Sequence, residues 1–303
     1  MMNRIDIGNG NRAKVLSSAA SSSSRTIVII PGFTCPASFL CRLVKVAKLT
    51  CTHHVVVVEL PFQGTDARPH CHLRGEKNPF PDIDLLVSHV QAVLRALAKT
   101  NPVPPILCGY SLGGGIALQI ASRAPRDVKA IALLSPASFE TLHDDFHLLL
   151  EKSPRRVHAW ETAEEMEEAF TRTMGGISPK AWAYVPSLIV KGMVRERARL
   201  GSGYYSEFAR IVFANKKKGE LAREVLPKLK DAALPVLLIT GGKDVCIDSD
   251  KCVSEIADVL GPELCESVVL PGCGHMGAKG GGTFLDHAAL TLNEFLSRLD
   301  AIQ

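Results

Sequence analysis

Short runs of consecutive apolar residues recur along the chain, and each run ends at a residue type that breaks strands. These runs cover residues 26–30, 55–58, 105–108, 130–134 and 236–239, with a weaker sixth run at 267–270. Because every position in a run is apolar, rather than every second position, both faces of each strand are expected to be buried. This pattern predicts a parallel sheet that helices cover on both sides.

Amphipathic stretches lie between these runs and predict helices. They cover residues 39–49, 83–98, 113–124, 249–260 and 284–299. Strands that alternate with helices of about ten or more residues are typical of the α/β class. We therefore predict a mostly parallel, doubly wound sheet.

The N-terminal segment is basic and rich in serine, as a transit peptide would be, but its residue pattern indicates structure. Residues 4–7 alternate between polar and apolar, residues 8–11 favour a turn, and residues 13–16 can return as a second strand. We predict a β-hairpin that leads through the serine-rich linker into the strand at 26–30.

The alternation of strands and helices stops between residues 139 and 232, where only helical signals occur. Thr162–Glu165 is a capping box, and Ser178 stands as an N-cap residue before a proline that can start a helix. An all-helical insertion between two strands is expected to cover the C-terminal ends of the sheet, where ligand sites lie. The predicted division is an α/β core at 1–138 and 233–303 with a helical cap, or lid, at 139–232.

Composition and charge narrow the class of protein. The 303 residues are 46% hydrophobic and 22% charged, with a net charge of +4. Such an apolar fraction excludes a disordered or fibrous chain. The charge is too mild to indicate nucleic-acid binding, and the run Lys216–Lys218 is interpreted as solvated. No apolar stretch reaches the roughly 18 residues that span a bilayer, and a secretory signal is lacking. A soluble, cytoplasmic protein is expected.

Cysteine and histidine spacing argues against disulfides and metal sites. The nine cysteines include no Cys-x-x-Cys pair and would leave one residue unpaired, so we interpret them as reduced thiols. Histidines cluster at 53–54, 70–72 and 143–147, but none of these clusters completes a zinc pattern. We therefore expect neither a metal nor another cofactor.

One serine stands in a motif with chemical meaning. Gly109-Tyr110-Ser111-Leu112-Gly113 follows the apolar run at 105–108 and opens a helical pattern. A Gly-x-Ser-x-Gly sequence between a strand and a helix is typical of a nucleophile elbow, whose glycines Gly109 and Gly113 leave room for a strained turn. An anion-binding glycine-rich turn is the alternative.

A serine hydroxyl needs a base, and the base needs an orienting acid. Asp244 follows the strand at 236–239, and His275 follows the strand at 267–270, so both leave the sheet at the same edge as Ser111. The order Ser, Asp, His is the one expected for this fold. Asp248 is the rival acid, and His287, inside a helical pattern, is a weaker rival base. We predict that the backbone N–H groups of Leu112 and Phe33 form the oxyanion hole.

These motifs together resemble the α/β-hydrolase superfamily over nearly the whole chain. Pro31-Gly32-Phe33 is similar to the family's oxyanion loop, and Glu59–Thr65 is similar to its Asp-x-Pro-Gly-x-Gly-x-Ser segment. In the cap, Thr162–Met166, Tyr184–Ser187, Lys191-Gly192, Tyr205 and Phe208 resemble monoacylglycerol-lipase-like hydrolases. Pro31 replaces the usual histidine and Phe62-Gln63 replaces a Gly-His pair, which implies a reshaped mouth of the site. The membrane-spanning N-terminus of some relatives is absent, which implies a soluble or peripherally bound protein.

The resemblance implies a serine esterase that acts on apolar acyl esters, with monoacylglycerol as the favoured example. A thioesterase, a carbon–carbon hydrolase or lyase, and a binding protein with a retained triad are the alternatives. The apolar cap segment 185–194 either lines an acyl pocket, touches a membrane surface peripherally or forms the core of the cap. Candidate pocket residues are Trp182, Leu188, Tyr205 and Met276.

Overall fold

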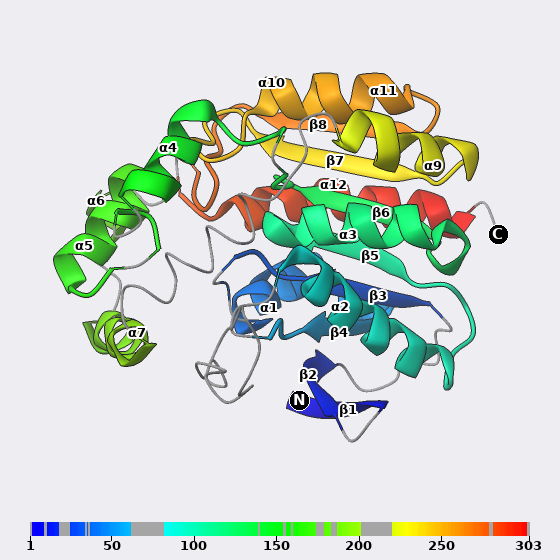
Figure 1. Cartoon of the computed structure of the whole chain (residues 1–303), viewed down its shortest axis with the longest axis horizontal. Helices are drawn as coiled ribbons and strands as arrows, with labels where there is room; N and C mark the ends of the chain where they lie inside the picture. The colour runs from blue at the N-terminus through cyan, green and yellow to red at the C-terminus, as the bar shows by residue number, and fades with distance from the viewer. Residues whose placement is uncertain are drawn as a thin grey trace.

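The computed structural model of the chain has a single eight-stranded sheet at its centre (Figure 1). It describes residues 2–8, 11–17, 25–33, 35, 37–61, 82–138, 140–153, 156–158, 160–173, 179–182, 187–200, 220–278 and 281–301. The order across the sheet is β1-β2-β4-β3-β5-β6-β7-β8. The strands are β1 (Met2–Gly8), β2 (Asn11–Ser17), β3 (Thr26–Ile30), β4 (His54–Val58), β5 (Ile106–Tyr110), β6 (Ala130–Leu134), β7 (Val236–Gly241) and β8 (Cys265–Leu270).

The six strands from β3 to β8 run parallel, and the predicted N-terminal hairpin β1–β2 joins them antiparallel to β4. Every residue of β3, β5, β6 and β7 is buried, as continuous apolar runs predict. Strand β8 forms the edge of the sheet, and beyond Cys265 it alternates between partly buried and exposed residues. Its position explains why its apolar signal is weaker. The predicted fold class is confirmed.

Helices cover both faces of the sheet. Helices α1 (Ala37–Val46) and α12 (Phe284–Ala301) pack on one face. The other face carries α2 (Ile83–Ala98), α3 (Leu112–Arg123), α9 (Leu226–Asp231) and a continuous helical segment made of α10 (Ser249–Cys252), the π-turn η7 (Val253–Ala257) and α11 (Asp258–Leu260). Alternate residues of each strand point into the two resulting cores; for example, Val28 enters one and Ile29 the other.

The remaining α-helices of the described chain gather at one end of the sheet, on the left of Figure 1. They are α4 (Asp144–Lys152), α5 (Ala163–Glu168), α6 (Pro179–Trp182) and α7 (Ser187–Leu200), and the π-turn η5 (Ala169–Thr173) extends α5. Thr162 caps α5, since its Oγ1 accepts the Glu165 N–H at 3.2 Å, as the capping box predicts. A small separate core that includes Trp160, Met166 and Val190 holds α5, α6 and α7 together. Helix α4 packs on the large core instead, through Phe146 and Leu150.

One part of the predicted cap belongs to the α/β core. Helix α9 and the preceding turn η6 (Leu221–Val225) lie within the segment 139–232, yet they contact α3, and α9 also contacts α11. Their buried residues Leu226 and Leu229 join the core beneath the sheet. An amphipathic helix that covers a sheet and one that covers a cap show the same residue pattern, so the sequence does not distinguish the two. The division at 138 and 232 stays a prediction.

Two further features bear on the sequence predictions. Of the cysteines that the structure describes, none forms a disulfide. Among the helices in the described ranges, none is both long and apolar enough to cross a membrane.

Candidate active site

Ser111 occupies a strained turn between β5 and α3. Its backbone angles are φ 54° and ψ −121°, an uncommon conformation for a residue other than glycine. Backbone hydrogen bonds hold it there. The Ser111 N–H donates to the Leu134 carbonyl at 2.9 Å, and the Ser111 carbonyl accepts the N–H groups of Gly114 and Ala137 at 2.8 Å each and that of Gly115 at 3.4 Å. The surrounding backbone thus maintains the strain at this serine.

The glycines of the motif are required by close backbone contacts. A Cβ atom on Gly109 would lie 2.3 Å from the Gly113 carbonyl oxygen, and one on Gly113 would lie 2.1 Å from the Ile30 carbonyl oxygen. Gly32, in the loop after β3, is also confined, since a Cβ there would lie 3.0 Å from the Ser111 Cβ. The oxyanion-loop segment of the sequence therefore lies directly beside the serine.

His275 connects Ser111 to Asp244, although the three residues follow three different strands. Its Nε2 lies 3.1 Å from Ser111 Oγ, and its Nδ1 lies 2.7 Å from Asp244 Oδ2. The second oxygen of Asp244 accepts the N–H groups of Cys246 and Ile247 at 2.9 Å each. A buried carboxylate needs hydrogen-bond partners, and these contacts fix its orientation toward the imidazole.

Neither rival residue contacts Ser111 or His275 through a described hydrogen bond. The Asp248 carboxylate caps α10, because its Oδ1 accepts the N–H groups of Asp250 and Lys251. His287 lies in α12, where its Nε2 is 3.3 Å from the Gly281 carbonyl oxygen.

Tyr110 is a site residue that the sequence pattern does not reveal. Its hydroxyl donates to the His275 carbonyl at 2.8 Å, and its ring stacks on the imidazole with 5.3 Å between centroids. Burial raises the pKa of the Tyr110 phenol well above its usual range, so the hydroxyl remains a donor. No signal in the sequence marks this contact, because the two residues meet only in the folded chain.

The two predicted oxyanion donors belong to backbone segments that adjoin Ser111. Leu112 is the first residue of α3, so its N–H is one of the helix's unpaired N-terminal donors. Phe33 follows Gly32 in the loop beside Ser111. A helix N-terminus also favours a developing negative charge.

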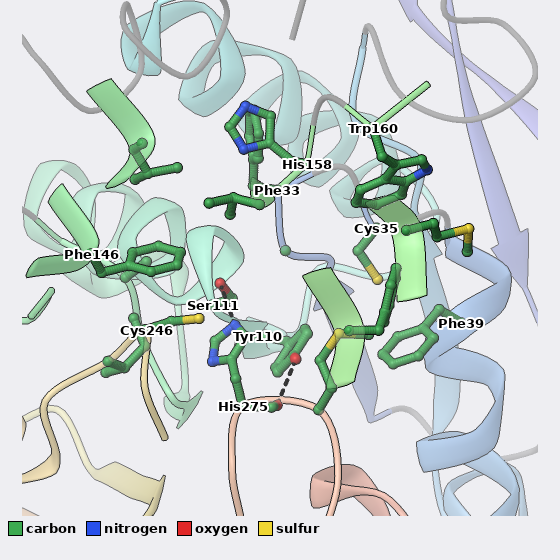
Figure 2. Close-up of a pocket in the computed structure, with 18 of the residues that line it drawn as sticks. Phe33, Cys35, Phe39, Tyr110, Ser111, Phe146, His158, Trp160, Cys246 and His275 are labelled. Atoms are coloured by element: carbon green, nitrogen blue, oxygen red, sulfur yellow. Dashed lines mark hydrogen bonds between the residues drawn. The ribbon is translucent and has the colours of Figure 1, made fainter. Parts of the chain in front are cut away.

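A cavity of about 380 Å³ opens beside Ser111 and His275 (Figure 2). Of the predicted pocket residues, Trp182 and Met276 line it. The prediction for Leu188 is wrong, because its side chain is 80% exposed on α7 and Val190, two residues along, enters the core of the cap instead. Tyr205 lies outside the described residues.

Asp244, Cys246 and His275 form the one group of potential metal ligands in the described ranges, with ligand atoms within 4.8 Å of one another. The Asp244 and His275 atoms are already hydrogen-bonded to each other. Burial and the neighbouring Asp244 carboxylate raise the pKa of the Cys246 thiol well above its usual range, so it is neutral near pH 7. The group is therefore better suited to proton transfer than to binding a cation.

The fold is that of the α/β class of hydrolases, and comparisons with known proteins agree. Residues 27–289 match the model of the alpha/beta hydrolase family, and the chain belongs to that family. It is 27% identical over 233 residues to pimeloyl-[acyl-carrier protein] methyl ester esterase of Nitrosospira multiformis, covering 73% of this chain and 76% of the relative. It is also 27% identical over 262 residues to mouse (Mus musculus) monoacylglycerol lipase ABHD6, covering 82% of this chain and 70% of the relative.

A solved structure of a membrane phospholipase A shares the fold, with a TM-score of 0.74 and 20% identity over 99% of this chain and 86% of that one. The sequence relatives are esterases and lipases, and the protein is a hydrolase of this general type. The predicted family is confirmed.

Proposed function

We propose that the protein is a serine esterase that cleaves carboxylic esters of apolar acyl groups through Ser111, His275 and Asp244. The observation that carries this proposal is the imidazole of His275, which lies within hydrogen-bond distance of both Ser111 Oγ and Asp244 Oδ2. A base of this kind can take the serine proton only when an acid fixes its tautomer and ring orientation.

The reaction follows from this geometry. Ser111 Oγ attacks the ester carbonyl carbon while His275 Nε2 takes its proton, and the Asp244 carboxylate stabilises the imidazolium that forms. The carbon–oxygen bond to the alcohol then breaks as His275 returns the proton to the leaving oxygen. Water attacks the acyl-enzyme in the same way, which releases the carboxylic acid and restores Ser111.

The oxyanion formed in each step is assigned to the N–H groups of Leu112 and Phe33. Both belong to backbone segments held beside Ser111 by close contacts, so they need little rearrangement during the reaction. One such donor typically contributes about 3–4 kcal/mol to transition-state stabilisation.

The lining of the cavity supports an apolar acyl group. Among the described lining residues, none is Asp, Glu, Lys or Arg, and most carry apolar side chains. One relative is named as a pimeloyl-[acyl-carrier protein] methyl ester esterase and another as a monoacylglycerol lipase, and the second name favours monoacylglycerol as a first substrate to test.

Active-site labelling tests the proposal. A fluorophosphonate probe is expected to label the wild type and not Ser111→Ala, because only an activated serine attacks the phosphorus. Turnover of p-nitrophenyl butyrate by Ser111→Ala should fall by at least about a thousandfold. Ser38→Ala is the matched control, since Ser38 also lines the cavity. This variant should retain both labelling and turnover. Undiminished activity of Ser111→Ala, or labelling of that variant, contradicts the mechanism.

A further inference from the structure

The cavity beside Ser111 lies between two separate groups of apolar side chains. The first, here named the α4 arm, belongs to the large core beneath the sheet and consists of Leu142, Phe146, Leu150, Val157 and Ile247. The second, here named the tryptophan arm, belongs to the core of the cap and consists of Trp160, Met166, Phe170, Trp182, Met193 and Met276.

The reacting residues stand where the two arms meet. Figure 2 shows Phe146 on one side of Ser111 and His275, and Trp160 on the other side. A carbonyl carbon within reach of Ser111 Oγ therefore has apolar surface in both directions. A substrate with a single apolar group would fill one arm and leave the other without a partner.

The two arms differ in shape and chemistry. In the tryptophan arm, the rings of Trp160 and Phe170 meet edge to face at 5.3 Å, and the rings of Phe170 and Trp182 stack at 5.7 Å. Such ring faces, together with flexible methionine side chains, favour a planar aromatic group. The α4 arm has mostly branched aliphatic side chains and offers shape complementarity to an alkyl chain instead.

Polar groups are few on both sides of the reaction centre. His158 is 2% exposed and lies edge to face against Phe33 at 5.0 Å, above the serine in Figure 2. Of the described lining residues in the two arms, none carries a charge. A charged leaving group would therefore enter the cavity without a counter-charge, which disfavours it.

We propose that the natural substrate is an ester with apolar groups on both sides of the scissile bond, an alkyl group in the α4 arm and an aromatic group in the tryptophan arm. This inference rests on the proposed esterase function and specifies its substrate class. It predicts that a monoacylglycerol, whose alcohol part is small and polar, is a poorer substrate than an ester that fills both arms.

A set of four esters tests the proposal. We expect kcat/KM for 2-phenylethyl hexanoate to exceed the values for methyl hexanoate, 2-phenylethyl acetate and 1-monohexanoylglycerol by at least about tenfold each, since each of the three leaves one arm empty. Values for methyl hexanoate or 1-monohexanoylglycerol within about threefold of the two-sided ester overturn it.

Variants that fill one arm at a time sharpen the test. Val157→Phe, in the α4 arm, should lower kcat/KM for 2-phenylethyl hexanoate to the value for 2-phenylethyl acetate and leave the latter unchanged. Met193→Trp, in the tryptophan arm, should lower kcat/KM for 2-phenylethyl hexanoate to the value for methyl hexanoate. Both variants should still react with a methyl fluorophosphonate probe, which needs neither arm. If Val157→Phe does not react, Leu150→Trp replaces it.

The outcomes separate the two proposals. Absence of labelling and of hydrolysis in the wild type, for all four esters, contradicts the esterase function itself. Labelling of both variants with unchanged preference among the esters leaves the esterase function intact and overturns the two-arm substrate.

Discussion

The loops at the ends of the strands and the cap contribute to the site by different means. Backbone contacts hold the loops in place: the Lys243 N–H donates to the Cys273 carbonyl at 2.8 Å, and a Cβ on Gly241 would lie 2.6 Å from that same carbonyl oxygen. The cap contributes mainly side chains, such as the rings of Trp160, Phe170 and Trp182 around its small core.

This difference separates chemistry from specificity. A close backbone contact tolerates few substitutions because it leaves no room for an added side chain, whereas an apolar wall accepts many side chains of similar volume. We therefore expect changes in the loops to affect every substrate alike and changes in the cap to affect some substrates more than others.

Asp244→Asn should produce the largest effect in this comparison. The substitution keeps the size of the side chain but removes the charge that stabilises imidazolium and orients His275 at 2.7 Å. We expect kcat for p-nitrophenyl butyrate to fall about 10³–10⁴-fold. Asp248→Asn is the control, because asparagine also caps helices well and Asp248 serves α10. A large loss of kcat in Asp248→Asn, together with a small loss in Asp244→Asn, would assign the role of the orienting acid to Asp248.

Gly113→Ala and Gly192→Ala compare the effect of an added methyl group in the core with its effect in the cap. The new methyl group at 113 would lie 2.1 Å from the Ile30 carbonyl oxygen, whereas at 192, on α7, it meets nothing within 4 Å. Urea denaturation should give a free energy of unfolding lower by about 3 kcal/mol for Gly113→Ala. Gly192→Ala should raise it by about 0.5–1 kcal/mol, because alanine has the higher helix propensity. Equal effects of the two variants would erase the distinction between the regions.

The same distinction explains what the sequence can predict. Ser111, Asp244 and His275 are predicted to lie together because each follows a strand of a parallel sheet, and parallel strands bring their C-terminal ends to one edge. Leu188 and Val190 cannot be told apart, because both stand in one apolar stretch and only packing decides which of them faces the core. Composition and motif spacing carry no record of such packing.

Tyr110→Phe tests a contact that only the folded chain reveals. Phenylalanine keeps the ring against His275 but removes the hydroxyl that donates to the His275 carbonyl at 2.8 Å. We expect kcat to fall about tenfold, with KM unchanged, because a lost buried hydrogen bond is worth roughly 1–3 kcal/mol and the loop that carries His275 is then held less firmly. Loss of stability with unchanged kcat would make Tyr110 a purely structural residue.

Leu188→Ser should produce the smallest effect and bears on the predicted contact of the cap with a membrane surface. Because the Leu188 side chain is 80% exposed, its replacement should change the free energy of unfolding by less than about 0.5 kcal/mol. Turnover of dissolved p-nitrophenyl butyrate should be unchanged. Val190→Ala, in the buried core of the cap, is the contrasting variant and should destabilise the protein by about 2 kcal/mol.

If the cap contacts membranes, Leu188→Ser should also slow hydrolysis of a monoacylglycerol embedded in phosphatidylcholine vesicles, since the transfer of an exposed leucine into the lipid interface is favourable. Equal rates on vesicles for Leu188→Ser and wild type would show that this leucine makes no such contact. The cap would then act in the reaction only through the side chains that line the cavity.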